Sequence, residues 1–490
     1  MRIYRQALVL LTLLGISLFG ANKAFAQEMA GFVPDNMAGV NRGIINPAAI
    51  FDSPNCLDIS LVTGNFSVQN NYLFLPRGTF SLRDLANFRD TYLAEPGEYF
   101  STRENISAMH GRQNLRLQGP SVLFKYKNHS FAFVNSIRGV SSIKRIPDHM
   151  VNFFTYGLTY TPQHNIPFNE TRAFSVASLG WAEIGLGYAT QLMSSPTENI
   201  TLGITAKYLM GYHGLSARSE ELLYEVNEER DVYFSRFNSN SYLSLPIDFI
   251  TNDFTGFESR VNGRGLTFDL GVTYTQKGQS AQPGKSNLFA WDPAYADYKY
   301  RLGFSLLDLG SIRLRENTRQ VVFENADFVW FDPQWEDYLN LDELLTELRE
   351  NQNSGEINTI DGEPFRMYLP SAASLQLDYN FGNNFFTYFM WVQDIPIARN
   401  RVARSSQIGV IPRYETRWFA VALPITLHEY RTPRVGLSVR IAFLTIGTEQ
   451  PGGLLNINDM YGADFYFSIS WGFKNCWFNK SSVNPCLNGW

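Results

Sequence analysis

The chain has 490 residues, a formal net charge of −5 and a mean hydropathy of −0.18. This acidic balance argues against a nucleic-acid-binding protein, which needs a basic footprint. Aromatic residues make up 15% of the chain and glycine is frequent. This composition is typical of a membrane-spanning β-barrel, although a large secreted β-protein shares it.

The N-terminus has the pattern of a secretory signal peptide, which we expect to span residues 1–26. Arg2 and Arg5 form a short positive region, an apolar stretch follows, and Ala24-Phe25-Ala26 supplies small residues at the cleavage positions. The apolar stretch is too short for a spanning helix, which needs about 20 apolar residues. Loss of the three cations in this segment would change the net charge from −5 to −8.

Residues 27–54 form a separate segment ahead of the first plausible strand. The segment contains Asn46-Pro47-Ala48, which by itself is an ordinary turn that could start a strand. We therefore expect a boundary near residue 55, where a strand pattern begins.

Residues 55–473 alternate between apolar and polar side chains, which predicts strands with two different faces. The alternation is clearest over Ile200–Met210, Leu266–Tyr274, Val435–Phe443 and Phe465–Phe473. Each stretch is about as long as the roughly 9–11 residues that a tilted strand needs to cross a bilayer, whereas globular strands run about 5–6. The polar face carries Gly, Ser and Thr with single charges, as expected for a face toward a polar lumen.

We predict an all-β fold, a transmembrane antiparallel β-barrel of about 14 strands. Unpaired backbone groups have no water to bond in the hydrocarbon layer, so the sheet has to close on itself. The pattern allows about 13 to 15 strands, and bacterial single-chain barrels use even numbers, so about 12 or 16 are the alternatives. The barrel would lie among the lipids of a Gram-negative outer membrane, with both termini in the periplasm.

Single charges on the polar faces are expected to point into the lumen, where opposite charges can pair. In a soluble sandwich the same side chains would be solvated. These candidate lumen charges are Lys207, Asp269, Arg301, Asp378 and Arg440. Their partners cannot be assigned from the sequence, because a one-residue slip in register turns each side chain to the opposite face.

Connections of two kinds are expected between the strands. Short turns at residues 127–130 and 380–383 would lie at the periplasmic end. Longer insertions near 77–118, 218–262 and 313–366 would be loops at the outer surface.

Two of the expected outer loops contain signals for short helices. One helix would start at the cap Ser81. The other would start at Asp332-Pro333 and carry an apolar stripe of Leu341, Leu345 and Leu348. Either helix could form a lid or a docking surface, or could simply pack against its own loop.

Residues 474–490 form an extension after the last predicted strand and contain two of the three cysteines. Cys476 and Cys486 are close enough in sequence to form a disulfide in an oxidising periplasm, which would leave Cys56 unpaired. Free thiols are the alternative. No histidine lies near the pair with zinc-ligand spacing, so we expect no metal site there.

The segment Gly39 to Ala49, with its Asn46-Pro47-Ala48 motif, resembles the long-chain fatty-acid transporter (FadL-like) superfamily of outer-membrane barrels. That superfamily includes barrels associated with type IX secretion in Bacteroidota, and the whole chain looks like an uncharacterised Bacteroidota outer-membrane protein family. Met367 to Ser371 and Asp459 to Phe467 belong to the same resemblance. The resemblance implies that residues 27–54 fold into the lumen as a hatch. The Gly-rich, acidic sequence that usually precedes the motif is thin here.

No catalytic signature stands out, so we expect neither an enzyme nor a cofactor. The chain lacks a Gly-x-Ser-x-Gly turn, a His-Glu-x-x-His pair and a phosphate-binding Gly-rich loop. We expect instead a subunit or scaffold of a larger outer-membrane complex, for secretion or surface proteins, with other outer-membrane or periplasmic proteins as partners. The alternative is a FadL-like passive transporter of hydrophobic or small solutes. An apolar pocket that leads to a gap in the wall would favour transport, and a lumen filled with paired charges would favour the scaffold.

Overall fold

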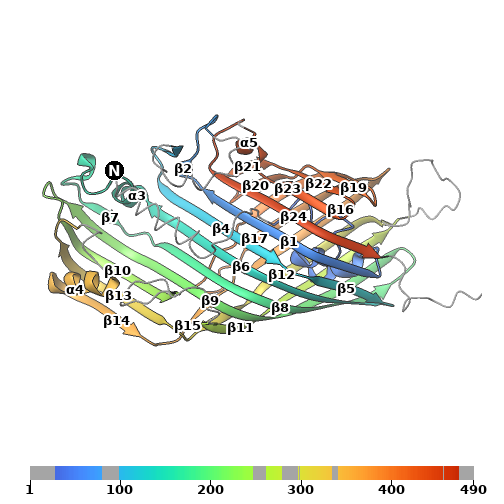
Figure 1. The fold of residues 1–490 in the computed structure, drawn as a ribbon, viewed down its shortest axis with the longest axis horizontal. Coiled ribbons are helices and arrows are strands. Elements are labelled where there is room, and N and C mark those ends of the chain that lie inside the picture. The colour runs from blue at the N-terminus through green and yellow to red at the C-terminus, as the bar shows by residue number, and fades with distance from the viewer. Residues whose placement is uncertain are drawn as a thin grey trace, which may run out of the picture.

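The computed structural model describes residues 28–79, 99–246, 261–278, 296, 298–333, 340–455 and 457–473. Its main feature is a large antiparallel sheet that closes on itself, because β1 (Leu57–Asn70) pairs with β24 (Gly462–Phe473) (Figure 1). The prediction of a closed antiparallel β-barrel is confirmed. Among the residues described, no helix is both long and apolar enough to cross a membrane.

The barrel wall has 14 strands, as predicted, and several of them are interrupted. The continuous ones are β1, β6 (His129–Pro147), β8 (Phe174–Ser194), β9 (Glu198–Val226), β17 (Phe385–Asp394), β18 (Gln407–Glu415), β23 (Leu444–Thr448) and β24. The interrupted ones are β4 with β5 (Ala108–Gln118, Ser121–Tyr126), β10 with β11 (Val232–Ser244, Gly263–Lys277), β12 with β13 (Tyr298–Leu314, Thr318–Trp330), β14 with β15 and β16 (Gln352–Asp361, Phe365–Tyr368, Ala372–Gly382), β19 with β20 (Phe419–Ala422, Ile425–His428) and β21 with β22 (Thr432–Val435, Leu437–Ile441).

Short elements lie between the wall strands. They are the two-stranded sheet of β2 (Leu73–Phe74) and β3 (Ser101–Thr102), the strand β7 (Phe168–Glu170), the helices α3 (Asp148–Tyr156), α4 (Leu341–Glu350) and α5 (Pro451–Leu454), and the 3-10 turn η5 (Thr161–Gln163). Two further 3-10 helices precede β1 and are described with the functional site.

The two faces of the wall differ as the alternation predicts. Along β9, Leu202 and Ile204 are exposed, whereas the residues between and beside them, such as Thr201 and Thr205, are buried inside the barrel. The same alternation repeats along β11, where Leu266 and other apolar side chains point outward. An outward apolar band around a polar interior is the architecture of an outer-membrane barrel.

Tight turns join strands at one end of the barrel. Lys127 and Asn128 connect β5 to β6, and Asn383 and Asn384 connect β16 to β17. Lys127, Asn383 and Asn384 have positive φ, a conformation that two-residue hairpin turns require and that asparagine tolerates. Both expected turns are therefore present, the second one slightly later in the chain than predicted.

Two of the three expected outer loops contain long strands, so the loop predictions for 218–262 and 313–366 are wrong over those strands. Those ranges contain the end of β9, and β10, β13, β14 and β15. These strands lie beyond the part of the wall that alternates apolar and polar residues. A strand outside the bilayer needs no apolar lipid-facing side, so its sequence carries a weaker period-two signal.

The predicted helix with the Leu341, Leu345 and Leu348 stripe is α4. Its N-cap is Asn340, whose side chain accepts a hydrogen bond from the Glu343 backbone N–H at 3.0 Å, and not Asp332 as expected. The helix that was expected from Ser81 lies outside the described residues.

A structure that we call the outer lobe lies at the end of the barrel opposite the tight turns (Figure 1). It consists of α3, α4, β7, β10, β13, β14 and the last part of β9. Leu345 and Leu348 of α4 pack into its buried cluster together with Phe328. Phe328 stacks on Phe234 with ring centroids 4.5 Å apart. The helix α4 therefore packs against the strands of its own loop, one of the two arrangements considered from the sequence.

Cys56, just before β1, is buried and disulfide-bonded. The expectation that it is unpaired is therefore wrong. Cys476 and Cys486 both lie outside the described residues. Since the chain has three cysteines, a bond from Cys56 to either of them competes with the predicted pair.

Candidate functional site

Residues 28–56, here called the lumen segment, lie inside the barrel. The segment contains the 3-10 helices η1 (Gly39–Ile44) and η2 (Pro47–Asp52), drawn in blue in Figure 1. Its buried apolar residues pack against inward-facing wall residues in two clusters. In the larger one, Met29, Ala30, Phe32, Val33, Ala38 and Ile45 pack with Ala372, Tyr388, Met390, Val392, Ile411, Ala422 and Tyr466. In the smaller one, Val40 and Ile50 pack with Leu123, Ala132 and Ala189. The wall closes by pairing of β1 with β24, without any strand from the segment. The segment therefore fills the barrel and does not complete it.

Asn46, the first residue of the Asn-Pro-Ala motif, connects the lumen segment to the wall. Its Oδ1 accepts a hydrogen bond from the Ala48 N–H at 2.9 Å and so caps η2, whose first residue is Pro47. Its Nδ2 donates to Gln376 Oε1 at 2.9 Å and to the Val272 carbonyl at 3.2 Å. The motif is therefore the start of a 3-10 helix. The alternative considered from the sequence, a turn that starts a strand, is not what the structure has.

Two wall glycines make this contact possible. Gly203 on β9 and Gly271 on β11 are paired across the two strands. A Cβ at Gly203 would overlap the backbone of Pro47 and Ala48, and one at Gly271 would overlap the Asn46 side chain. The motif can lie against the wall only where these positions have no side chain.

Lys207 and Asp269, two of the predicted lumen charges, contact each other directly. Lys207 Nζ lies 2.6 Å from Asp269 Oδ2 and 3.3 Å from Asp308 Oδ1. Asp308 also accepts hydrogen bonds from both terminal nitrogens of Arg138, at 2.8 and 3.0 Å. These residues are buried, so each charge is held by partners and not by bulk water.

A second network surrounds Asp378, which accepts two hydrogen bonds from Arg413, both at 2.9 Å, and one from the Tyr298 hydroxyl at 2.7 Å. The other two predicted charges contact the lumen segment. Arg301 donates to Asn36 Oδ1 at 2.8 Å, and Arg440 donates to Asp35 Oδ2 at 2.6 Å.

The sequence did not identify the partners of these charges. Arg413 lies on the buried face of the regular alternation along β18, so the same period-two pattern could have identified it. Asp308 lies at positive φ where the register between β11 and β12 shifts, so alternation misplaces it. Arg404 lies outside any strand and Glu28 lies in the lumen segment, so neither carries a periodic signal.

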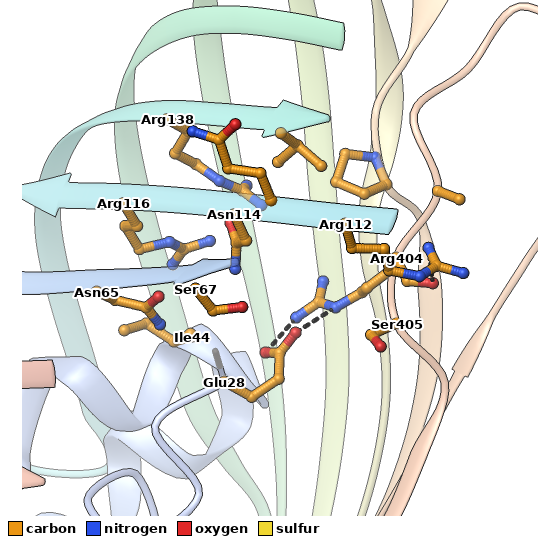
Figure 2. A pocket seen from close by; sticks show the side chains of 14 residues that line it. Glu28, Ile44, Asn65, Ser67, Arg112, Asn114, Arg116, Arg138, Arg404 and Ser405 are labelled. Atoms are coloured by element: carbon orange, nitrogen blue, oxygen red, sulfur yellow. Dashed lines mark hydrogen bonds and ion pairs between the residues drawn. The ribbon is translucent and has the colours of Figure 1, made fainter. Parts of the chain in front are cut away.

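The start of the lumen segment is held by Glu28 and Arg404. The Arg404 guanidinium donates from Nε to Glu28 Oε1 at 2.8 Å and from Nη2 to Oε2 at 2.7 Å (Figure 2). Burial alone would raise the pKa of Glu28, but the charges of Arg404, Arg116 and Arg138 together outweigh burial and hold that pKa below its usual value. Burial would likewise lower the pKa of Arg404, but Glu28 and then Asp308 raise it. Both groups are therefore charged at neutral pH.

A cavity of about 40 Å³ lies between the lumen segment and the wall (Figure 2). Its polar and charged lining residues are Glu28, Asn65, Ser67, Arg112, Gln113, Asn114, Arg116, Arg138, Arg404 and Ser405. Four of these are arginines and one is an acid, so the lining is basic. Throughout the part of the chain that the structure describes, no group of three or more His, Cys, Asp or Glu could hold a metal ion.

A model of a family of unknown function, DUF5723, matches residues 47–449. No curated protein matches the chain. Among solved structures, the toluene transporter TbuX of Ralstonia pickettii is similar at 7% identity and a TM-score of 0.38, over 89% of this chain and 94% of that one. The toluene transporter TodX of P. putida is similar at 10% identity and a TM-score of 0.38, over 90% of this chain and 95% of that one. At such low identities and TM-scores, neither likeness indicates what this chain carries.

Proposed function

The chain belongs to the DUF5723 family, whose function is unknown, and we propose that it is a passive channel for small solutes in the outer membrane, closed at rest by the lumen segment. The observation that carries this proposal is that the barrel wall and the lumen segment, which obstructs it, are separate parts of the chain. The wall closes by its own strand pairing, and residues 28–56 fill it as one continuous piece from a single end of the chain. Displacing that piece would open a passage without breaking the wall.

The contacts of the lumen segment are of a kind that water can replace. Asn46, Asn36 and Asp35 each bond to the wall through side-chain groups. A neutral hydrogen bond such as that of Asn46 contributes about 0.5–1.5 kcal/mol net, and one to a charged group such as Arg301 or Arg440 contributes about 1.5–3 kcal/mol. A displaced segment would expose these polar wall groups together with the apolar wall residues of the larger cluster. The charged groups on the exposed wall would suit a small polar solute.

The test is to immobilise the lumen segment in the full-length chain. In the variant Asn46→Cys with Gln376→Cys, a short bifunctional thiol reagent would join the segment to β16. We expect reconstituted liposomes to take up small sugars and small acids through the untreated double variant. Uptake through the cross-linked protein should be at least about tenfold slower, which corresponds to a change of about 1.4 kcal/mol or more in the free energy of binding or gating.

Two controls make this experiment decisive. The wild type and Asn46→Cys alone, each treated with the reagent, account for the native cysteines and for the lost asparagine. Equal uptake before and after cross-linking would show that the lumen segment is not the gate. Absence of uptake in every protein, the wild type included, would exclude a channel for these solutes.

The second candidate is the scaffold of an outer-membrane complex, which two observations favour. The lumen contains paired charges, and the outer lobe is large. β9 alone has 29 residues, whereas a spanning strand needs about 9–11. Purification of the tagged protein from its native membrane in mild detergent would recover stoichiometric partners if it is a scaffold, and the barrel alone if it is not.

A further inference from the structure

Arg116 on β4 is a buried cation whose guanidinium makes no direct contact with an acid among the described residues. Arg116 is only 8% exposed to solvent. Within the part of the chain that the structure describes, no hydrogen bond or ion pair reaches its guanidinium. Its side chain lines the cavity beside the lumen segment (Figure 2). Buried donors that make no hydrogen bond are unfavourable, so a ligand with acceptor oxygens in the adjacent cavity would stabilise them.

The other three arginines of the cavity already have acidic partners. Arg112 lies 3.1 Å from Glu429, and Arg138 lies 2.8 Å from Asp308. Arg404 is held by Glu28, the acid of the lining. The carboxylates of Glu183 and Asp308 balance the charge of Arg116 from beyond hydrogen-bond distance. What remains available in the cavity is therefore the set of hydrogen-bond donors of its guanidinium.

Polar groups surround Arg116 on two adjacent strands. Arg116 on β4 pairs with Asn65 on β1, and Asn114 pairs with Ser67 in the same register. The Asn114 Oδ1 has no hydrogen-bond partner among the described residues. Figure 2 shows these four side chains together, next to the lumen segment. A guanidinium, amides and a hydroxyl on one face are the groups that bind the oxygens of an anion.

The cavity also has a suitable size. One buried water needs about 10–15 Å³, so the cavity of about 40 Å³ has room for a few water-sized atoms. A carboxylate or phosphate group fits this space, whereas a hydrocarbon chain does not.

We propose that Arg116, Asn114 and Ser67 form a binding site for one oxyanion group, a carboxylate or a phosphate, of a small solute that passes between the lumen segment and the wall. This names the solute class of the proposed channel and rests on that function for its role in transport. The site lies against Ile44 and Glu28 of the lumen segment. An anion bound there would be held by wall residues at the place where the lumen segment has to separate from the wall.

The test measures binding separately from transport. Thermal unfolding of the purified full-length protein in detergent would be followed in phosphate, in acetate and in chloride at equal ionic strength. We expect phosphate or acetate to raise the midpoint of unfolding relative to chloride, because a ligand that binds only the folded state stabilises it by mass action. The variant Arg116→Gln should lose this response, with an affinity at least about tenfold weaker by calorimetry.

Two more variants distinguish an anion site from a structural arginine. Arg116→Lys keeps the charge and should keep part of the response, and Arg366→Gln on the exposed face of β15 should keep all of it. A response in Arg116→Gln equal to that of the wild type, or no response in the wild type, would overturn the proposal.

The two proposals can fail independently. Binding that depends on Arg116, together with no solute uptake, would leave the anion site standing and reject the channel. Solute uptake with no anion binding would leave the channel standing and reject the site.

Discussion

Arg413 shows how the lumen accommodates buried charge. Its side chain is 1% exposed and bonds to Asp378 and Glu415, with Nε 2.9 Å from the latter. The Tyr298 hydroxyl donates to the same Asp378. Each charged group thus has several partners, which is the condition under which a buried ion pair is tolerated at all.

Replacing Arg413 by Met should therefore destabilise the barrel strongly, since it leaves Asp378 buried without its cation. Removing one member of a buried pair typically costs about 3–5 kcal/mol. The free energy of unfolding, from guanidinium titrations in detergent micelles followed by tryptophan fluorescence, checks this.

The matched control is Arg218→Met. Arg218 pairs with Glu220 at 2.6 Å, but the two side chains are 35% and 48% exposed. Exposed pairs contribute about 0–1 kcal/mol, so the control should change stability little. Similar losses in both variants would contradict the assignment of a buried, partner-dependent charge to Arg413.

At the scale of elements, the strand β9 performs two tasks along its length. Its first part pairs with β11 and lies against the lumen segment at Gly203. Its last part pairs with β10 and belongs to the outer lobe. One strand therefore connects the surface outside the membrane with the wall that holds the Asn-Pro-Ala motif.

The substitution Gly203→Ala should loosen the lumen segment and leave the wall intact. The new Cβ would overlap the backbone of Pro47 and Ala48, and backbone cannot move aside as a side chain can. Overpacking of this kind costs about 1–3 kcal/mol, so amide hydrogen exchange in residues 44–52 should become about tenfold faster or more.

Gly187→Ala is the control for this prediction. Gly187 also faces the lumen, on the neighbouring strand β8, but the nearest atoms to its Cβ are side-chain atoms of Ala132 and Thr205, at 3.2 and 3.3 Å. Exchange in residues 44–52 should stay close to that of the wild type. The prediction fails if the two variants behave alike.

At the scale of the whole molecule, the two ends of the barrel differ. One end has the tight turns and the ends of β1 and β24, and the other carries the outer lobe (Figure 1). Bacterial barrels have short turns on the periplasmic side and longer loops outside. We predict that the outer lobe faces the cell exterior and that the start of β1 and the end of β24 face the periplasm.

This orientation predicts which positions a membrane-impermeant thiol reagent can reach on intact cells. Glu350→Cys, at the end of α4 in the outer lobe, should be labelled. Thr197→Cys, in the turn between β8 and β9, should be labelled only after the outer membrane has been permeabilised. Labelling of the wild type measures the background from the native cysteines, and the reverse pattern would invert the topology.

The sequence by itself determined the closed antiparallel barrel and the lipid-facing side of its clearest strands, and it indicated about 14 strands with about 12 or 16 as alternatives. Every backbone group must be paired in the bilayer, and side chains alternate with a period of two, so these properties are local and appear as a pattern. Leu202 and Leu266 can be placed on the outer face without knowing any neighbour.

Only the tertiary structure decided which groups meet inside the barrel. Asp308 reaches Lys207 through a bulge, Arg404 reaches Glu28 from outside any strand, and Asn46 finds Gln376 across the lumen. These contacts depend on strand register and on the path of a non-periodic segment, to which local alternation is insensitive. For the same reason, the sequence could not show that the Arg116 guanidinium lines the cavity without a direct contact to an acid among the described residues, whereas its neighbouring arginines have one.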